Sequence, residues 1–200
     1  VLNEGVVTGK AFDDRVGVAV MLWAARQLRD SEVTTYFVAT VQEEVGLRGA
    51  QVAADRVYPD FAIALDTTIA ADVPGVNERE FVTRIGKGPA IKVMDGGRGN
   101  VFIAHPALTN FLVSIAEELK IPYQLEVLIG GTTDALGIAF RRDGIPATTI
   151  SIPTRYVHSP VELLSINDAL NAAKLLTEAL SRADERFVQG LREKVIKVRS

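Results

Sequence analysis

The chain has 200 residues, of which 48% are hydrophobic and 24% charged, the balance of one ordinary soluble globular domain. Its 22 basic and 25 acidic side chains give a net charge of −3, which argues against a nucleic-acid partner, and no apolar run approaches the about 20 residues of a membrane span. Cysteine is absent, so disulfides, thiolate–metal sites and a cysteine nucleophile are excluded, and a reducing cytoplasmic location fits this composition.

Apolar patterns in the first third of the chain predict two helices and two strands. Residues 14–29 are apolar nearly all round, which predicts a buried helix lying flat against a sheet. Residues 34–41 (TTYFVATV) are β-branched and aromatic, and residues 61–65 (FAIAL) are a second apolar run, so both are predicted strands. A helix is predicted between them at 47–55, and this strand–helix–strand unit predicts parallel pairing of the two strands.

The same alternation continues through the rest of the chain. Residues 67–88 lack periodicity, which predicts loops around a site. Further strands are predicted at 89–94, 123–129 and 147–152, and further helices at 106–119 and 134–140. A last helix is predicted to begin at Ser165, where Asp168 three residues later is close to a capping box. The pattern predicts a single α/β domain formed by residues 1–200.

Acidic and imidazole side chains stand at the ends of these predicted elements. Four such clusters occur: Asp13 with Asp14, Glu43 with Glu44, Asp66 alone, and His158 alone. Ligands of open α/β sheets gather beyond the carboxyl ends of the strands, so the four clusters together predict one shared site. Any one of them would also fit the simple preference of acidic residues for loops and helix N-termini.

The Glu43–Glu44 pair is the sharpest local signal. Adjacent side chains on a strand point to opposite faces, so both carboxylates reach one site only where the strand breaks into a loop, and Gly46 supplies such a break. Two close carboxylates repel each other unless a cation lies between them, and a site of Asp, Glu and His without Cys suits a hard or borderline divalent ion. One Glu is then expected to coordinate the ion while its neighbour takes a proton from water.

Five motifs extend over nearly the whole chain: GKAFDDRVG (9–17), VQEEVG (41–46), ALDT (64–67), GGTTDA (130–135) and IPTRYVHSP (152–160). In sequence and in order they resemble the TET family, the tetrahedral aminopeptidases with co-catalytic metal ions, some of which were once labelled endoglucanases. Together with the alternation of elements, this resemblance predicts a three-layer αβα sandwich on a mixed, mainly parallel sheet. It also implies an aminopeptidase that acts on peptides, carries two divalent ions (zinc, or cobalt or manganese) and assembles into a dodecamer.

The resemblance implies a role for each matching residue. Asp13 matches the carboxylate that bridges both metal ions, and in this wider class of enzymes a cis peptide follows that residue. Glu43 matches the general base that passes a proton to the leaving amine. The remaining implied ligands are, for one ion, Glu44 and His158 and, for the other ion, Asp66. Thr133 and Asp134 match a loop near the substrate.

The chain departs from the family in one respect. The family has another metal-ligating histidine and a small inserted dimerisation domain, both upstream of the Asp-Asp pair, and neither is present here. The only histidines are His105 and His158, and His105 precedes Pro106, which is favoured at the first position of a helix. We therefore interpret His105 as a helix-entry residue. The chain, which starts at Val1, is expected to be the C-terminal portion of the catalytic domain and to hold the Asp66-side ion poorly by itself.

Two alternatives to an active peptidase stay open on the sequence alone. The chain could be a non-catalytic fragment or pseudoenzyme subunit of the same assembly, although every other motif residue is intact. A glycosidase could use Glu43 and Glu44 as acid and base at about 5–10 Å separation, but an aromatic content of 6% offers little for stacking sugars. Two bound metal ions would favour the peptidase. The low content of Asn and Gln, 11 in total, with no Cys favours a thermophilic source.

Overall fold

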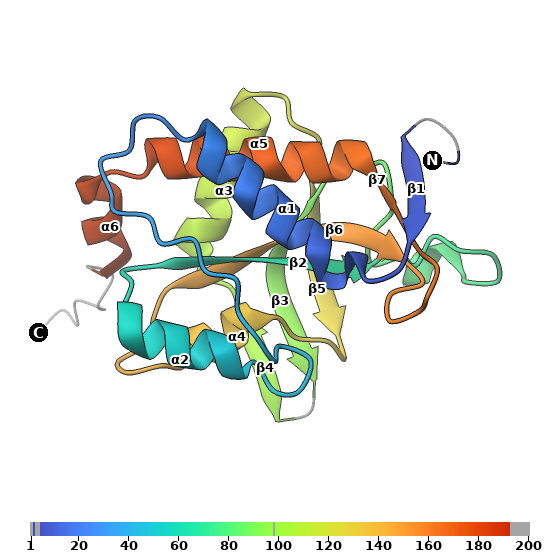
Figure 1. The fold of residues 1–200 in the computed structure, drawn as a ribbon, viewed down its shortest axis with the longest axis horizontal. Coiled ribbons are helices and arrows are strands. Elements are labelled where there is room, and N and C mark those ends of the chain that lie inside the picture. The colour runs from blue at the N-terminus through green and yellow to red at the C-terminus, as the bar shows by residue number, and fades with distance from the viewer. Residues whose placement is uncertain (1, 3–4, 98, 193–200) are drawn as a thin grey trace, which may run out of the picture.

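The computed structural model describes residues 2, 5–97 and 99–192, whose strands form one mixed sheet of seven (Figure 1). The strands are β1 (Val6–Gly9), β2 (Ala62–Ile69), β3 (Ala90–Gly97), β4 (Asn100–Ile103), β5 (Gln124–Ile129), β6 (Ala147–Arg155) and β7 (Glu162–Ser165). The helices are α1 (Phe12–Gln27), α2 (Arg48–Val57), α3 (Pro106–Glu118), α4 (Asp134–Ala139), α5 (Ile166–Arg182) and α6 (Glu185–Arg192), with a 3-10 turn at Glu78–Glu80. No helix in these described ranges is long and apolar enough to cross a membrane.

The predicted mixed sheet is confirmed, and its two longest ladders are parallel. β2 pairs with β6 along its whole length, and β3 pairs with β5. The shorter β1–β7, β3–β4, β3–β6 and β6–β7 pairings are antiparallel. Because β2 and β6 run in the same direction, Asp66 in the second half of β2 and the turn after β6 that carries His158 lie toward the same edge of the sheet.

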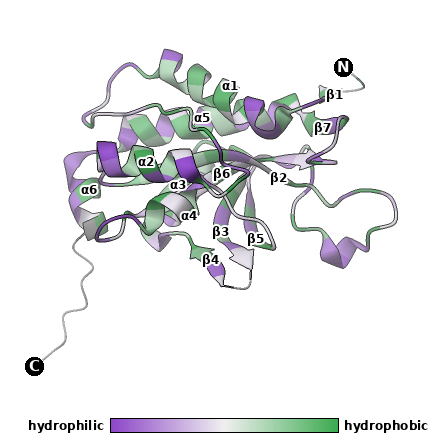
Figure 2. Ribbon diagram, turned by 60° about the horizontal axis from the view of Figure 1, so that its bottom comes forward, coloured by the Kyte–Doolittle hydropathy of each residue, from purple (hydrophilic) through white to green (hydrophobic). Residues whose placement is uncertain are grey.

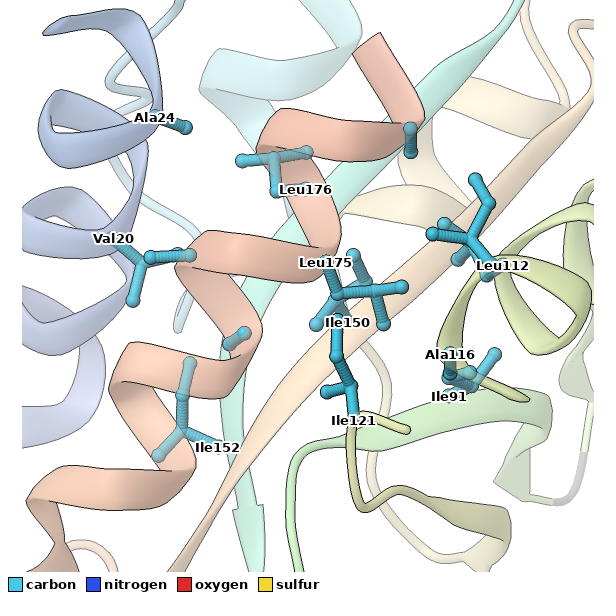
Figure 3. Close-up of a cluster of buried hydrophobic side chains, with 14 of the residues drawn as sticks. Val20, Ala24, Ile91, Leu112, Ala116, Ile121, Ile150, Ile152, Leu175 and Leu176 are labelled. Carbon is cyan, nitrogen blue, oxygen red and sulfur yellow. The ribbon is translucent and has the colours of Figure 1, made fainter. Parts of the chain in front are cut away.

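Helices cover both faces of the sheet, which gives the three layers that were predicted. α1, α3 and α5 pack on one face, and α2 and α4 on the other (Figure 1). Figure 3 shows the larger core, to which α1 contributes Val20 and Ala24, α5 contributes Leu175 and Leu176, and β6 contributes Ile150 and Ile152. Each of these aliphatic side chains is nearly fully buried, and burial of one contributes about 1.5–3 kcal/mol to stability. Ala24 of α1 has no bulk beyond Cβ and allows the two helices to approach closely.

Helix α1 is less buried than its composition predicted. Gly17, Val20 and Ala24 face the interior, but Leu22 and Trp23 are 56% and 51% exposed. Figure 2 shows α1 as an outer element that carries hydrophobic residues along much of its length. Only one side of a helix can contact a sheet and a neighbouring helix, so apolar composition alone does not bury the opposite side.

The predicted strand at 34–41 is wrong. Residues 34–40 have no regular secondary structure, and a cavity of about 790 Å³ is lined by this segment on one side and by β2 on the other. A strand needs backbone hydrogen bonds to a neighbour, and within the described residues β2 has β6 on one edge and no ladder on its other edge. The predicted parallel pairing of 34–41 with 61–65 is therefore absent, although α2 and β2 themselves form.

The start of α5 also differs from its prediction. Ser165 is the N-cap residue, but its side chain makes no capping hydrogen bond. Asp168 instead accepts hydrogen bonds from the backbone N–H groups of Gly86 (2.6 Å) and Gly88 (2.8 Å). The Asp168 carboxylate therefore fixes the end of the loop before β3. Because it is bonded to these distant N–H groups, it does not form a capping box with Ser165.

Candidate metal centre

Two groups of side chains have ligand atoms close enough to share a metal ion. The first group is Asp13, Glu44 and His158, and the second group is Asp13, Asp14 and Asp66; within each, the ligand atoms lie within 4.8 Å of one another. Asp13 belongs to both groups, as a carboxylate that bridges two ions must. Carboxylates with one imidazole and no thiolate suit a hard or borderline divalent cation, so the donor set fits the ions that the resemblance implied.

Asp13 and Asp14 lie where β1 turns into α1. Both have non-helical backbone angles, and the peptide bond between them is cis, which confirms that prediction. The regular helix follows Asp14, whose Oδ1 accepts a hydrogen bond from the Gly17 N–H at 3.0 Å, as an N-cap side chain does. Asp13 thus precedes the regular part of α1, and its Oδ2 lies 3.0 Å from Nε2 of His158.

Glu44 and His158 come to the first group from two turns. Residues 43–46 form a turn closed by a hydrogen bond from the Gly46 N–H to the Glu43 carbonyl at 3.0 Å, so the turn predicted at Gly46 is confirmed although no strand precedes it. Oε2 of Glu44 lies 3.3 Å from Nε2 of His158. The side chains of His158 and Glu44 are 66% and 59% exposed, against 11% for Asp13. The first group is therefore open to solvent on the side of Glu44 and His158.

The second group is buried more deeply. Asp66 lies in the second half of β2, where its Oδ1 accepts a hydrogen bond from the Thr67 N–H at 2.7 Å. Burial, followed by the nearby charges of Asp14, Glu43 and Asp13, raises the pKa of Asp66 well above its usual value. Burial, opposed by the Gly17 hydrogen bond, raises the pKa of Asp14 to about 8.

Glu43 belongs to neither group but lies beside both. Burial, then the charges of Asp134, Glu44 and Asp13, raises its pKa to about 7. A carboxylate with a pKa near neutral can both accept and return a proton at physiological pH. Burial is the largest cause of the raised pKa values in this cluster, and repulsion between the neighbouring carboxylates adds to it. A divalent cation would remove that repulsion.

Asp134, Thr133 and His105 belong to neither ligand group. Asp134 begins α4, lines the same cavity as Glu43, and accepts a hydrogen bond from the Thr40 hydroxyl at 2.5 Å. Thr133 is buried and turned inward, where its hydroxyl hydrogen-bonds to Asp95 (3.3 Å) and Thr149 (2.8 Å). His105 directly precedes the first residue of α3, as predicted, and it is in neither group.

Sequence analysis left two residues of this region without a role. The helix predicted at 14–29 already began at Asp14, and the hydrogen bond from the Gly17 N–H, three residues on, gives its carboxylate the role of an N-cap side chain. Glu162 accepts hydrogen bonds from the backbone of Asp13 and His158. No short-range pattern could have identified it, since its contacts with α1 join residues about 150 positions apart.

Comparisons with a family model, with protein sequences and with solved structures all identify aminopeptidases. The family model described as M42 glutamyl aminopeptidase matches residues 1–175. Lysyl aminopeptidase of Pyrococcus furiosus is 42% identical over 175 residues, which cover 87% of this chain and 48% of that protein. The structure of aminopeptidase APDkam598 from Desulfurococcus kamchatkensis is 52% identical with a TM-score of 0.95, covering 98% of this chain and 55% of the other.

A TET peptidase is also among the similar structures. TET1 peptidase of Pyrococcus horikoshii, which can assemble into a tetrahedron or a large octahedral shell, is 34% identical with a TM-score of 0.78, covering 92% of this chain and 52% of the other. The resemblance to TET aminopeptidases is thus confirmed. The chain spans about half the length of the curated relatives it matches.

Proposed function

Because this chain belongs to the M42 glutamyl aminopeptidase family, we propose that it carries the metal centre of an aminopeptidase that removes N-terminal residues from peptides. The observation that supports this most is the double role of Asp13, which is common to two groups of potential ligands. In the proposal Asp13 bridges two divalent ions. The ligands assigned to the single ions are Glu44 and His158 for one and Asp66 for the other.

The ions, when bound, would supply Lewis-acid polarisation of the scissile carbonyl and stabilise the charge that develops there. Glu43 is proposed to take a proton from the attacking water and to deliver it to the leaving amine. Its position beside both groups, without belonging to either, leaves its carboxylate free for this transfer. Thr133 supports the loop before α4 through its hydrogen bonds to Asp95 and Thr149, and Asp134 lines the same cavity as Glu43, where its charge adds to the effect of burial on the Glu43 pKa.

The two ions should not be held equally. The first group includes the imidazole of His158, whereas the second group consists only of carboxylates. We propose that this chain binds its first ion through Asp13, Glu44 and His158 and its second, on the Asp66 side, more weakly. Zinc, cobalt and manganese all fit this set of ligands. If the second ion does not bind, the chain would be a non-catalytic subunit, which is one of the alternatives that the sequence analysis did not exclude.

Location and assembly are part of the same proposal. The absence of cysteine fits a reducing cytoplasm. Assembly into a large homo-oligomer, a dodecamer, is proposed from the likeness to TET1 peptidase. The apolar side chains exposed on β4 and β5, the two strands that flank β3, would suit subunit contact: Val101, Ile103, Val127 and Ile129. Light scattering that finds only a monomer would contradict it.

Two variants test the assigned roles. Glu43→Gln keeps the shape of the side chain but removes its basicity, so bound metal should persist while turnover falls by at least about 10²–10⁴-fold. Glu44→Gln weakens a ligand and should release metal together with activity. Metal stoichiometry and hydrolysis of an unblocked peptide are measured for both, with the exposed Glu80→Gln as control. Metal loss in the Glu43 variant alone would reverse the two roles, and full activity in both would refute the proposal.

A further inference from the structure

Glu162 is an acidic residue buried beside the metal centre, although it belongs to neither ligand group. It is the first residue of β7 and is only 2% exposed. Its Oε2 accepts hydrogen bonds from the backbone N–H groups of Phe12 and Asp13, the latter at 3.1 Å. Its Oε1 accepts one from the backbone N–H of His158 at 3.2 Å. A single carboxylate therefore holds the backbones of two residues whose side chains meet in the first group.

The fold explains how Glu162 reaches both segments. β1 and β7 pair so that Gly9 lies opposite Glu162, and the chain leaves β1 directly toward Asp13. On the other side, His158 lies in the turn between β6 and β7, four residues before Glu162. The carboxylate thus sits where the entrance to α1 and the turn after β6 converge.

Both held segments have unusual backbone conformations. Ala11 and His158 have φ values of +57° and +62°, in the left-handed region that non-glycine residues rarely adopt. Such conformations persist when surrounding contacts hold them. The hydrogen bonds from Phe12, which follows Ala11, and from His158 itself are contacts of this kind.

The charge of Glu162 is compensated by these donors. Within the described residues no basic side chain forms an ion pair with it, and all three of its partners are backbone N–H groups. Hydrogen bonds from N–H groups to an ionised carboxylate are stronger than those to a neutral acceptor. An ionised carboxylate offers two acceptor oxygens, whereas glutamine offers one oxygen and an NH₂ group that would face a donor.

We propose that Glu162 is a positioning residue of the metal centre, which sets the separation of Asp13 and His158 by holding their backbones through its two oxygens. This inference rests on the proposed function, since the residues that it holds are ligands only if the centre binds metal. Groups that orient metal ligands from behind typically change metal affinity by about 10–100-fold when they are replaced.

The first test measures metal affinity of the 200-residue chain by titration with Co²⁺, followed by absorbance. Glu162→Gln should weaken Co²⁺ binding about 10–100-fold. Glu162→Asp, whose shorter side chain cannot reach both segments, should weaken it as well and serves if the first variant does not fold. Asp168→Asn is the matched control, because Asp168 is also a buried carboxylate that accepts two backbone N–H bonds, from Gly86 and Gly88, outside the site.

A purely structural role gives a different result. The control should lose thermal stability yet keep its Co²⁺ affinity within about twofold of the unmodified chain, since it removes the same kind of contact at a site away from the ligands. If Glu162→Gln likewise loses stability and keeps its affinity, Glu162 only stabilises the fold and the inference is overturned.

Amide hydrogen exchange in the metal-free chain gives an independent readout. The N–H groups of Asp13 and His158 should be protected in the unmodified chain and in Asp168→Asn, and should lose protection in Glu162→Gln. Unprotected amides in the unmodified chain would overturn the role of Glu162. Failure of the unmodified chain to bind Co²⁺ would instead contradict the proposed function, so the two failures can be told apart.

Discussion

Without metal, the folded chain should become less stable as the pH rises from about 4 to 8, because its acidic centre resists ionisation. Burial raises the pKa of Asp14 from its ordinary value of 3.8 to about 8, and that of Glu43 from 4.5 to about 7. Between the unfolded and folded pKa values the folded chain binds more protons than the unfolded chain. The contribution of these two groups to the free energy of unfolding is therefore fully present below about pH 4 and is lost as the pH rises toward the folded pKa values.

The size of the effect follows from the same values. One pH unit between the folded and unfolded pKa corresponds to about 1.4 kcal/mol, so the gap of about four units for Asp14 sets a limit of about 6 kcal/mol. Glu43 is partly exposed and adds less, since solvent screens its charge. We expect a loss of about 3–6 kcal/mol across this range, a large part of the about 5–15 kcal/mol that stabilises a typical domain.

Urea unfolding at pH 5, 6, 7 and 8 in the presence of a chelator measures this loss. Asp14→Asn cannot ionise but can still accept the Gly17 hydrogen bond, so it should flatten the pH dependence and be more stable than the unmodified chain at pH 8. The exposed Asp30→Asn is the control and should change neither. A divalent ion at about 100 times its Kd should restore about 2.7 kcal/mol at pH 8. A stability that rises from pH 5 to 8, or an unchanged slope in Asp14→Asn, would refute this reasoning.

Two further predictions concern the scaffold. Lys92 and Glu126 form a fully buried ion pair at 2.7 Å, so Lys92→Met should cost about 3–5 kcal/mol in urea unfolding, and Lys92→Met with Glu126→Gln should be more stable than the single variant because no buried charge is left unpaired. A double variant no more stable than the single one would contradict this. A Cβ on Gly88 (φ +91°) would lie 1.9 Å from the Pro122 carbonyl oxygen, whereas the space around Gly86 (φ +73°) is open. Gly88→Ala should therefore lower the Tm more than Gly86→Ala. Equal losses of Tm would show that the backbone angle alone matters.

Elements with strong local signals could be predicted from the sequence. The helix that begins at Pro106 forms as α3, and the apolar run at 147–152 forms the start of β6, within the part of the chain the structure describes. Gly46 correctly marked the turn that carries Glu43 and Glu44. These features depend on backbone preferences and on residues close in the sequence, which local patterns record.

The elements and contacts that were missed or wrongly predicted depend on residues that are distant in the sequence. The short strands β1, β4 and β7 and helix α6 had no sequence signal strong enough to predict them. Residues 34–41 have the composition of a strand, but composition does not supply the neighbouring backbone that a strand needs. The carboxylate of Asp168 was assigned to a local cap, whereas its actual donors, Gly86 and Gly88, lie about 80 positions away.

The sequence by itself determined which residue types are available at the centre: carboxylates, one imidazole and no thiolate, set at the ends of predicted elements. The resemblance read from the sequence had implied that Asp13 bridges two ions and that Glu43 is not a ligand, whereas only the tertiary structure decided that Asp14 joins the second group and that Glu162 holds two of the ligand backbones. The reason is physical. A side chain's chemistry belongs to the residue, but its pKa, its neighbours and its separation from other ligands arise when β1, β2, β6 and β7 bring distant segments to one edge of the sheet.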